Sequence, residues 1–253
     1  MLKVSGLNVR DDRQILRVKN ASFTLKEGEI LGIVGVSGNG QNELVEAITG
    51  LRSWENGEVL LDDEPLTCGS IRNRRLHQIG YVPQDRIRYG SSRDSSLVEN
   101  CIMGYHLQHL RKKKFLMDYN AAASFTKDIV SNYKVKAGSI QDRAGSLSGG
   151  NLQKLIVGRE FSQNNKVLVI EDPTRGIDVG AIEYIHKQIV AERDKGRAVL
   201  LVSLELDEVM NLSDRILVIY EGEIVGEFDP KKTTVEELGL YMAGAKKQGE
   251  AKA

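Results

Sequence analysis

The chain has 253 residues, enough for one large domain or two small ones, and its 41% hydrophobic and 28% charged residues are typical of a soluble protein with a sizeable core. Lysine plus arginine and aspartate plus glutamate both number 35, so no positive excess predicts a nucleic-acid partner. The sequence lacks an apolar run near the roughly 18 residues of a membrane span, and its start lacks the apolar stretch of a secretory signal. Cys68 and Cys101 have no disulfide or metal-site spacing, which predicts two thiols in a reducing cytosol.

The first 66 residues carry β-strand patterns. Apolar–polar alternation, or a continuous apolar run, predicts strands at 3–9, 20–25 and 30–35. Residues 42–51 predict a short amphipathic helix, with Gly50 near its end. Asn56-Gly57 lies between two short extended segments and predicts a hairpin turn.

After a short strand at 79–84, no strand pattern occurs up to about residue 160, and three helical segments predict an inserted helical subdomain. These segments are 96–106, 118–133 and 151–161. The last third alternates strands and helices, which predicts a parallel sheet with crossover helices. Its segments are 166–170, 181–194, 197–203, 206–212 and 215–220. The polar end predicts a disordered tail at 243–253.

A glycine-rich loop joins the apolar strand at 30–35 to the helix that follows, which is the context of a phosphate-binding loop. The loop residues are Gly35, Val36, Ser37, Gly38, Asn39, Gly40, Gln41 and Asn42. Gln41 and Asn42 stand where that motif has lysine and serine or threonine. A dinucleotide-binding fingerprint fits less well, because Glu43 occupies the place of its third glycine, and a turn that only packs helix on strand is the other alternative.

The two substitutions in the loop, at Gln41 and Asn42, predict weaker binding of a nucleotide and slow hydrolysis. Backbone N–H groups still face an anion whatever the side chains are. Loss of the lysine removes a charged hydrogen bond of roughly 1.5–3 kcal/mol, or one to two decades of affinity. Gln41 can still donate an amide N–H, and Asn42 can offer an oxygen to Mg²⁺.

The segment LSGGNLQK at 147–154 is, in isolation, a good helix start. Ser148 is placed to cap a helix, and apolar residues supply a buried face at Leu152, Leu155 and Ile156. Other polar residues occur at the ends of predicted elements: Gln84, Glu171, Asp172 and Asp178. The chain carries, in this order, a glycine loop, a glutamine, the LSGG segment, an acidic strand end and an aspartate turn. This order resembles the nucleotide-binding domain of ABC ATPases over essentially the whole chain.

The sequence looks most like the C-terminal ATPase half of double-domain importers for nucleosides and simple sugars such as ribose and galactose, a half that commonly lacks the loop lysine. The resemblance implies an α/β P-loop ABC-type domain over 1–242, with a mostly parallel sheet core, an antiparallel β subdomain and an inserted helical subdomain. The antiparallel part would take about 1–25 and 52–66, the core about 26–51, 79–84 and 160–242, and the helical subdomain about 85–159. The resemblance also implies ATP and Mg²⁺ as cofactors. The implied partners are a second ABC nucleotide-binding domain, fused or separate, and transmembrane permease subunits. The implied location is peripheral, on the cytoplasmic face of the membrane.

In such proteins each ATP lies between the glycine loop of one domain and the LSGG of the other. The resemblance assigns the partner's ATP to Leu147, Ser148, Gly149, Gly150 and Asn151, with Asp178 in the D-loop. In the chain's own site Gln84 would approach Mg²⁺ and the attacking water, Glu171 would support the metal and Asp172 would be the general base. Asp172 is one methylene shorter than the usual glutamate, Leu204 replaces the switch histidine, and residues 1–22 lack the aromatic side chain that usually stacks on adenine. We therefore expect nucleotide to be held there but hydrolysed slowly or not at all.

The sequence leaves the role of two segments undecided and allows two other functions. Arg111–Lys114 predicts a solvated helix face or loop, with a membrane-headgroup contact as the alternative. Residues 85–105 correspond to the zone that receives the permease in this family, although ordinary packing explains their apolar residues equally well. The alternative functions are a nucleotide-sensing module without catalytic contribution and a non-transport ABC ATPase that acts on ribosomes or DNA.

Overall fold

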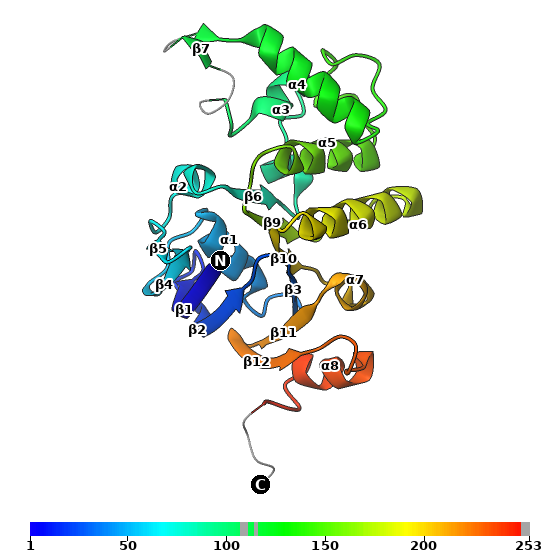
Figure 1. The fold of residues 1–253 in the computed structure, drawn as a ribbon. Helices are drawn as coiled ribbons and strands as arrows, with labels where there is room; N and C mark the ends of the chain where they lie inside the picture. The colour runs from blue at the N-terminus through cyan, green and yellow to red at the C-terminus, as the bar shows by residue number, and fades with distance from the viewer. Residues whose placement is uncertain (107–110, 114–115, 249–253) are drawn as a thin grey trace. The chain divides into compact units, whose positions relative to one another are not determined.

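The computed structural model describes residues 1–106, 111–113 and 116–248 (Figure 1). These residues form two compact units. Unit 1 comprises Met1–Tyr81, Lys166–Asp172 and Ile189–Ala253, and unit 2 comprises Val82–Asn165 and Pro173–Gln188. The functional boundaries expected from the sequence stay a prediction.

Unit 1 contains an antiparallel sheet in the order β2-β1-β4-β5, drawn in blue and cyan in Figure 1. Its strands are β1 (Leu2–Arg10), β2 (Leu16–Leu25), β4 (Asn56–Leu61) and β5 (Glu64–Pro65). The predicted hairpin turn at Asn56-Gly57 is wrong, because these residues begin β4, which pairs with β1. A Cβ on Gly57 would lie 2.5 Å from the carbonyl oxygen of Gly6, so the glycine allows the two strands to approach closely. The hairpin turn lies instead at Asp62-Asp63, where φ is 51° and 65°.

The second sheet has the order β12-β11-β3-β10-β9-β6. Its strands are β3 (Ile30–Val34), β6 (Ile79–Val82), β9 (Val167–Glu171), β10 (Ala198–Val202), β11 (Arg215–Tyr220) and β12 (Glu223–Phe228). Strand β3 pairs in parallel with β10 and β11, and β10 pairs in parallel with β9, so the predicted parallel sheet is confirmed. Every residue of β3, β9 and β10 is buried, which explains their continuous apolar runs.

Four helices accompany these sheets in the described part of unit 1: α1 (Gln41–Thr49), α2 (Ile71–Leu76), α7 (Leu206–Leu212) and α8 (Val235–Met242). Helix α6 (Val179–Asp194) begins in unit 2 and ends in unit 1. Helix α1 ends at Gly50 with φ 82°, as the sequence predicted. The buried side chain of Arg74 in α2 donates hydrogen bonds to the carbonyl oxygens of Ile48 (2.6 Å) and Thr67 (2.7 Å), so it satisfies a carbonyl at the end of α1. Burial lowers the pKa of Arg74 to about 10, which leaves it charged at neutral pH.

Unit 2 is mainly helical and contains α3 (Leu97–Ile102), α4 (Tyr119–Asn132) and α5 (Gly149–Phe161), drawn in green in Figure 1. It also contains a π-helical turn at Arg86–Gly90, a 3-10 turn at Ala144–Ser146 and two short strands, β7 (Arg111–Lys113) and β8 (Leu116–Met117). The expectation of no strands here is therefore wrong, and Arg111–Lys113 is a strand paired with β8. Lys114 lies outside the described residues. Helix α3 is shorter than predicted, because the chain turns at Gly104 with φ 84°.

A buried polar network stabilises the interior of unit 2. The carboxylate of Glu160, in α5, accepts hydrogen bonds from Tyr105 Oη (2.5 Å) and Arg159 Nε (2.9 Å). Asn165 donates to Tyr105 Oη (3.3 Å) and to the carbonyl oxygen of Glu160 (2.9 Å). Because Glu160 is fully buried, its charge is tolerated only with these partners in place.

The segment at 243–248, with which the predicted tail at 243–253 begins, makes contacts with β12, and the disorder of that tail stays a prediction. The backbone N–H of Gln248 donates to the carbonyl oxygen of Val225 (2.9 Å), and its side-chain amide donates to the carbonyl oxygen of Glu227 (2.9 Å). Lys247 pairs with Glu223 at 2.6 Å. These contacts attach the segment to β12, and 249–253 lie outside the described residues. Among the residues that the structure describes, no helix is both long and apolar enough to cross a membrane.

Candidate nucleotide site and signature tip

The glycine loop leaves the end of β3 and enters α1 through two residues with positive φ, Gly38 (89°) and Gly40 (103°). A Cβ on Gly40 would lie 2.2 Å from the carbonyl oxygen of Arg17, so this position requires glycine. A Cβ on Gly38 would meet nothing within 4 Å. The loop therefore has one glycine that allows close packing behind it and one that faces open space, where a ligand can approach the backbone.

Asn39 attaches the loop to the turn between β11 and β12. Its backbone N–H donates to the carbonyl oxygen of Val36 (3.2 Å), and its own carbonyl oxygen accepts from Gly222 N–H (3.0 Å). Its side-chain oxygen accepts from Glu221 N–H (3.1 Å). Asn39 thus holds the loop on a neighbouring hairpin, a role that local sequence pattern did not indicate, because the hairpin lies about 180 residues away in the chain.

Gln41, at the position of the usual lysine, is buried and turned toward the loop itself. Its side chain is 3% exposed, and its amide Nε2 donates to the carbonyl oxygen of Val36 at 3.1 Å. The amide expected to face a phosphate therefore closes the loop in this structure. Asn42, the expected Mg²⁺ ligand, is exposed at the start of α1.

The loop has the features that an anionic phosphate needs. The N-cap of α1, Gly40, makes no side-chain capping hydrogen bond, so the first N–H groups of this nine-residue helix remain available to a ligand. Glu43 in the first turn is the one acidic residue there and works against an anion. Within the described residues, no three His, Cys, Asp or Glu side chains are grouped to hold an ion, and the group expected to bind Mg²⁺ at this loop is the side-chain amide of Asn42.

Parallel strand register brings the acidic residues and the switch position to the same edge as the loop. Val202 in β10 lies between Ile33 of β3 and Glu171 of β9. Because Gly35, Asp172 and Leu204 each follow these residues by one or two positions, they lie together at the carboxyl edge of the sheet. The prediction that they would meet there rested on the family resemblance, and the register supplies its physical basis.

Both acidic side chains are already bound within unit 1. Glu171, 7% exposed, accepts a hydrogen bond from Tyr81 Oη at 2.7 Å. Asp172, 8% exposed, accepts one from the backbone N–H of Leu204 at 2.8 Å and has a left-handed backbone with φ 39°. The leucine side chain itself is 45% exposed and has no hydrogen-bonding group.

The LSGG segment forms the amino-terminal tip of α5 in unit 2. As predicted, Ser148 caps the helix, and its Oγ accepts from Asn151 N–H (3.4 Å) and Asn151 Nδ2 (2.9 Å). Asn151 Oδ1 in turn accepts from Lys136 N–H (2.9 Å). Ser148 is exposed, and within the described residues its hydroxyl donates no hydrogen bond.

Asp178 lies beside this tip. A Cβ on Gly150 would lie 2.9 Å from Asp178 Oδ2, and Asp178 Oδ1 accepts from Ala181 N–H (2.9 Å) at the start of α6. Gln84 is half-buried and contributes to a surface hollow of about 360 Å³ in the same unit. The hollow is lined by Gln84, Asp85, Arg86, Ile87, Arg175 and Gly176. Unit 2 therefore groups the LSGG residues, called the signature from here on, with Asp178. It also groups Gln84 with two arginines that the sequence pattern did not indicate.

The sequence model of the ABC transporter family matches residues 18–175. The chain belongs to the ABC transporter family. It is 41% identical over 244 residues to the nucleoside import ATP-binding protein NupA of Lactococcus lactis, covering 96% of the chain and 48% of that protein. It is also 41% identical over 253 residues to the guanosine import ATP-binding protein NupO of Bacillus subtilis, covering 100% of the chain and 50% of that protein. The chain thus spans about half the length of the curated relatives it matches.

The solved ABC cassettes confirm the expected α/β P-loop fold. A dimeric structure of the bacterial ABC transporter cassette MJ0796 gives a TM-score of 0.78 at 20% identity, covering 92% of this chain and 100% of that one. A second structure of that cassette, bound to ADP and phosphate after hydrolysis, gives a TM-score of 0.76. At this identity the likeness concerns the fold of this ABC domain alone.

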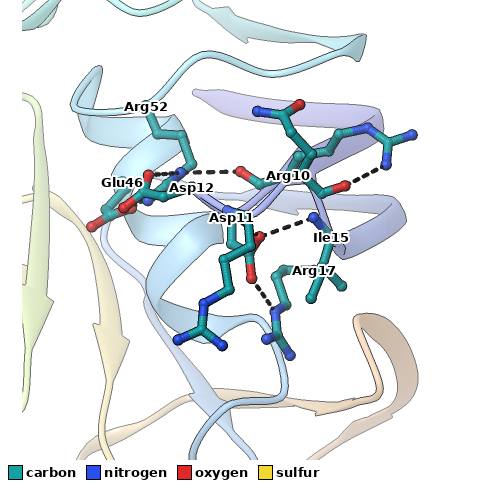
Figure 2. A network of polar contacts seen from close by, with 9 residues as sticks. Arg10, Asp11, Asp12, Ile15, Arg17, Glu46 and Arg52 are labelled. Atoms are coloured by element: carbon teal, nitrogen blue, oxygen red, sulfur yellow. Dashed lines mark hydrogen bonds and ion pairs between the residues drawn. The ribbon is translucent and has the colours of Figure 1, made fainter.

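A polar network holds the turn between β1 and β2 (Figure 2). This turn lies within residues 1–22, the segment that has no aromatic side chain to stack on adenine. Asp11 accepts from the N–H of Ile15 (2.9 Å) and from Arg17 Nε (2.9 Å), and the bond with Arg17 lowers the pKa of this carboxyl. Arg52 donates to Asp12 (2.8 Å) and to Glu46 of α1 (2.6 Å). The turn is thus held by ion pairs and carries Ile15, 48% exposed, as an apolar side chain.

Proposed function

We propose that this chain is the energy-coupling ATP-binding domain of an ABC importer for nucleosides or simple sugars. It would act at the cytoplasmic face of the membrane with transmembrane permease subunits and a second ABC domain, fused or separate, as an ATP hydrolase of the ABC transporter class. It would bind ATP at its own glycine loop and lend its LSGG tip to the ATP of the partner domain. Support comes from two relatives that are import ATP-binding proteins of about twice this length.

The observation that carries this proposal is the exposed tip of α5. Ser148 accepts hydrogen bonds from Asn151 and, within the described residues, donates none, so its hydroxyl hydrogen is free for an acceptor outside the fold. The amino terminus of a 13-residue helix adds a partial positive charge behind it. An oxygen of a γ-phosphate on a partner domain has the charge and the acceptor groups that this tip complements.

At its own site we propose that the chain holds ATP mainly through backbone N–H groups. The loop from Val36 to Gln41 and the start of α1 would bind the phosphates, with Asn42 and Gln84 as ligands of Mg²⁺, which supplies charge neutralisation when bound. Fast hydrolysis is not expected there. The general-base position, Asp172, already accepts an N–H group, and Leu204 has no side-chain group to steady a phosphate.

The test uses the full polypeptide, or the complex in which this chain occurs, with the partner domain present. Ser148→Arg would fill the tip with a bulky side chain, and we expect the ATPase rate to fall at least about a hundredfold, as for misplaced catalytic geometry. Ser131→Arg adds the same side chain at an exposed serine in α4 and is the matched control, expected to keep the normal rate. If Ser148→Arg is as active as the control, the shared site is wrong and a nucleotide-sensing module becomes the better interpretation.

A further inference from the structure

Arg86 lies at the centre of the loops that surround the signature tip. Its Nη1 donates to the carbonyl oxygen of Arg175 (2.7 Å) and its Nη2 to that of Gly176 (3.2 Å). A Cβ on Gly149 would lie 3.1 Å from the same Nη2, and a Cβ on Gly176 would lie 3.6 Å from it. The guanidinium therefore lies between two glycines, one in the LSGG tip and one in the segment that leads to Asp178.

The backbone of Arg86 is fixed independently of these contacts. Asp85 Oδ1 accepts the N–H groups of Ile87 (3.0 Å) and Arg88 (2.9 Å), which caps the π-helical turn that Arg86 begins. Ser91 Oγ donates to the carbonyl oxygen of Arg86 (2.7 Å). The turn ends at Gly90, whose carbonyl oxygen accepts from Arg159 of α5 (2.9 Å). Arg86 thus reaches the loop at 175–176 from a base anchored on the same helix whose tip carries the signature.

The loop that Arg86 holds is itself in contact with the tip. It leads to Asp178, which lies against Gly150 and binds the first turn of α6 through Ala181. A guanidinium is planar and donates from two nitrogens in fixed directions, so it sets the position of both carbonyl groups at once. Displacement of the loop would move the groups beside Gly149 and Gly150, and a shift of about 1 Å in a reacting geometry can cost about a hundredfold in rate.

Resting on the function proposed above, we propose that Arg86 is the positioning residue of the signature tip: its two hydrogen bonds to Arg175 and Gly176 hold that loop and Gly149 in the arrangement that closes on the partner's ATP. Arg86 also lines the hollow beside Gln84, so the same side chain connects the glutamine segment with the tip. Arg86 acts through the tip and does not itself contact the nucleotide.

The experiment measures kcat and KM for ATP in the assembled protein that contains the partner domain. For Arg86→Gln we expect kcat to fall about 10- to 100-fold, with KM changed less than about threefold because the partner's glycine loop supplies most of the binding. Arg86→Lys keeps the charge but cannot donate in the same fork, and it should fall between Arg86→Gln and the unchanged protein. Arg88→Gln is the matched control on the same turn, since Arg88 lies over the ring of Tyr89 and binds neither carbonyl group.

A second substitution tests whether Arg86 and the tip act as one unit. Gly149→Ala would bring a methyl group to 3.1 Å from Arg86 and should lower kcat when Arg86 is present. Combined with Arg86→Gln it should lower kcat much less than the product of the two single effects, because both changes disturb the same contact. Independent effects that multiply, or a normal kcat for Arg86→Gln, would overturn the inference.

Thermal unfolding of each variant separates lost positioning from lost folding. If Arg86→Gln does not fold, Arg86→Lys is judged by the same criteria. The Ser148→Arg variant distinguishes the two proposals: if it slows hydrolysis while Arg86→Gln and Arg86→Lys do not, only the role of Arg86 is wrong. If Ser148→Arg leaves the rate unchanged, the shared site itself fails.

Discussion

Replacing Gln41 by lysine should strengthen ATP binding at the glycine loop without restoring hydrolysis. In the present structure the Gln41 amide donates to the carbonyl oxygen of Val36 at 3.1 Å and is almost fully buried. A Cβ on Gly35 would lie 2.5 Å from this amide, so the side chain crosses the loop directly over a glycine. Lysine is one atom longer, which allows its ammonium group to pass Gly35 and reach the phosphate side of the loop.

The magnitude follows from the bonds made and lost. A hydrogen bond from the ammonium to a phosphate contributes about 1.5–3 kcal/mol, and the ammonium gives up the carbonyl oxygen of Val36, its acceptor in the ATP-free variant, at a cost of about 0.5–1.5 kcal/mol. The difference centres near 1 kcal/mol, which corresponds to a Kd for ATP about five- to tenfold lower. The hydrolysis rate at this site should stay low, because Asp172 and Leu204 are unchanged.

Calorimetric titration with ATP and, separately, with adenosine tests this reasoning. Adenosine carries no phosphate, so its Kd should not change, whereas that for ATP should fall. Gln41→Met removes the bond to Val36 without adding charge and should give no gain for either ligand. An equal gain for adenosine and ATP, or no gain for ATP with a folded variant, would refute the assignment of this position to phosphate binding.

Three further predictions concern the acidic strand end, the core of unit 2 and the thiols. Adding Asp172→Glu and Leu204→His to the lysine variant should restore hydrolysis at the chain's own site, seen as conversion of a second bound ATP per complex, because the longer base and a hydrogen-bonding switch residue are both supplied. Glu160→Ala should lower the free energy of unfolding by about 3–5 kcal/mol in urea titrations, since it leaves a buried guanidinium without its carboxylate, and Glu160→Gln should cost less. Burial raises the pKa of the Cys101 thiol to about 11 from 9.0, so a thiol reagent at pH 8 should modify the exposed Cys68 and spare Cys101 until the chain unfolds. Because the folded state favours the neutral thiol, its contribution to stability is complete below pH 9 and is lost as the pH rises toward 11, and Cys101→Ala should remove this alkaline dependence.

Local signals in the sequence predicted the parts of the fold that local contacts determine. Ser148 caps α5 through Asn151, three residues away, so a short motif contained all the groups needed. The loop from Gly35 to Gly40 likewise depends on backbone angles that only glycine adopts easily. The continuous apolar runs of the central strands predicted their burial on both faces, and the alternation with helices predicted their parallel pairing.

The predictions that failed depend on contacts far apart in the chain. Asn56-Gly57 has the composition of a hairpin turn, but the partner of β4 is β1, about 50 residues earlier, and Gly57 serves the close approach to Gly6. Gln248 binds the backbone of β12 through both its main chain and its side chain, contacts that the polar composition of its segment did not indicate. Neither the direction of the Gln41 amide nor the position of Arg86 between two glycines has a signal in the sequence.

The contrast between the two candidate sites has a single physical basis, which is whether the reactive groups are already used by the fold. In unit 1, Gln41 donates to Val36, and Asp172 accepts from Leu204. Releasing each such bond costs about 1 kcal/mol, so a phosphate or a water competes with the protein's own backbone for these side chains. In unit 2, the hydroxyl hydrogen of Ser148 has no acceptor among the described residues and can be given to a ligand at no such cost. The backbone N–H groups at the start of α1 are likewise uncapped, so unit 1 keeps the means to hold a phosphate while the side chains proposed for its chemistry are bound to the protein's own backbone.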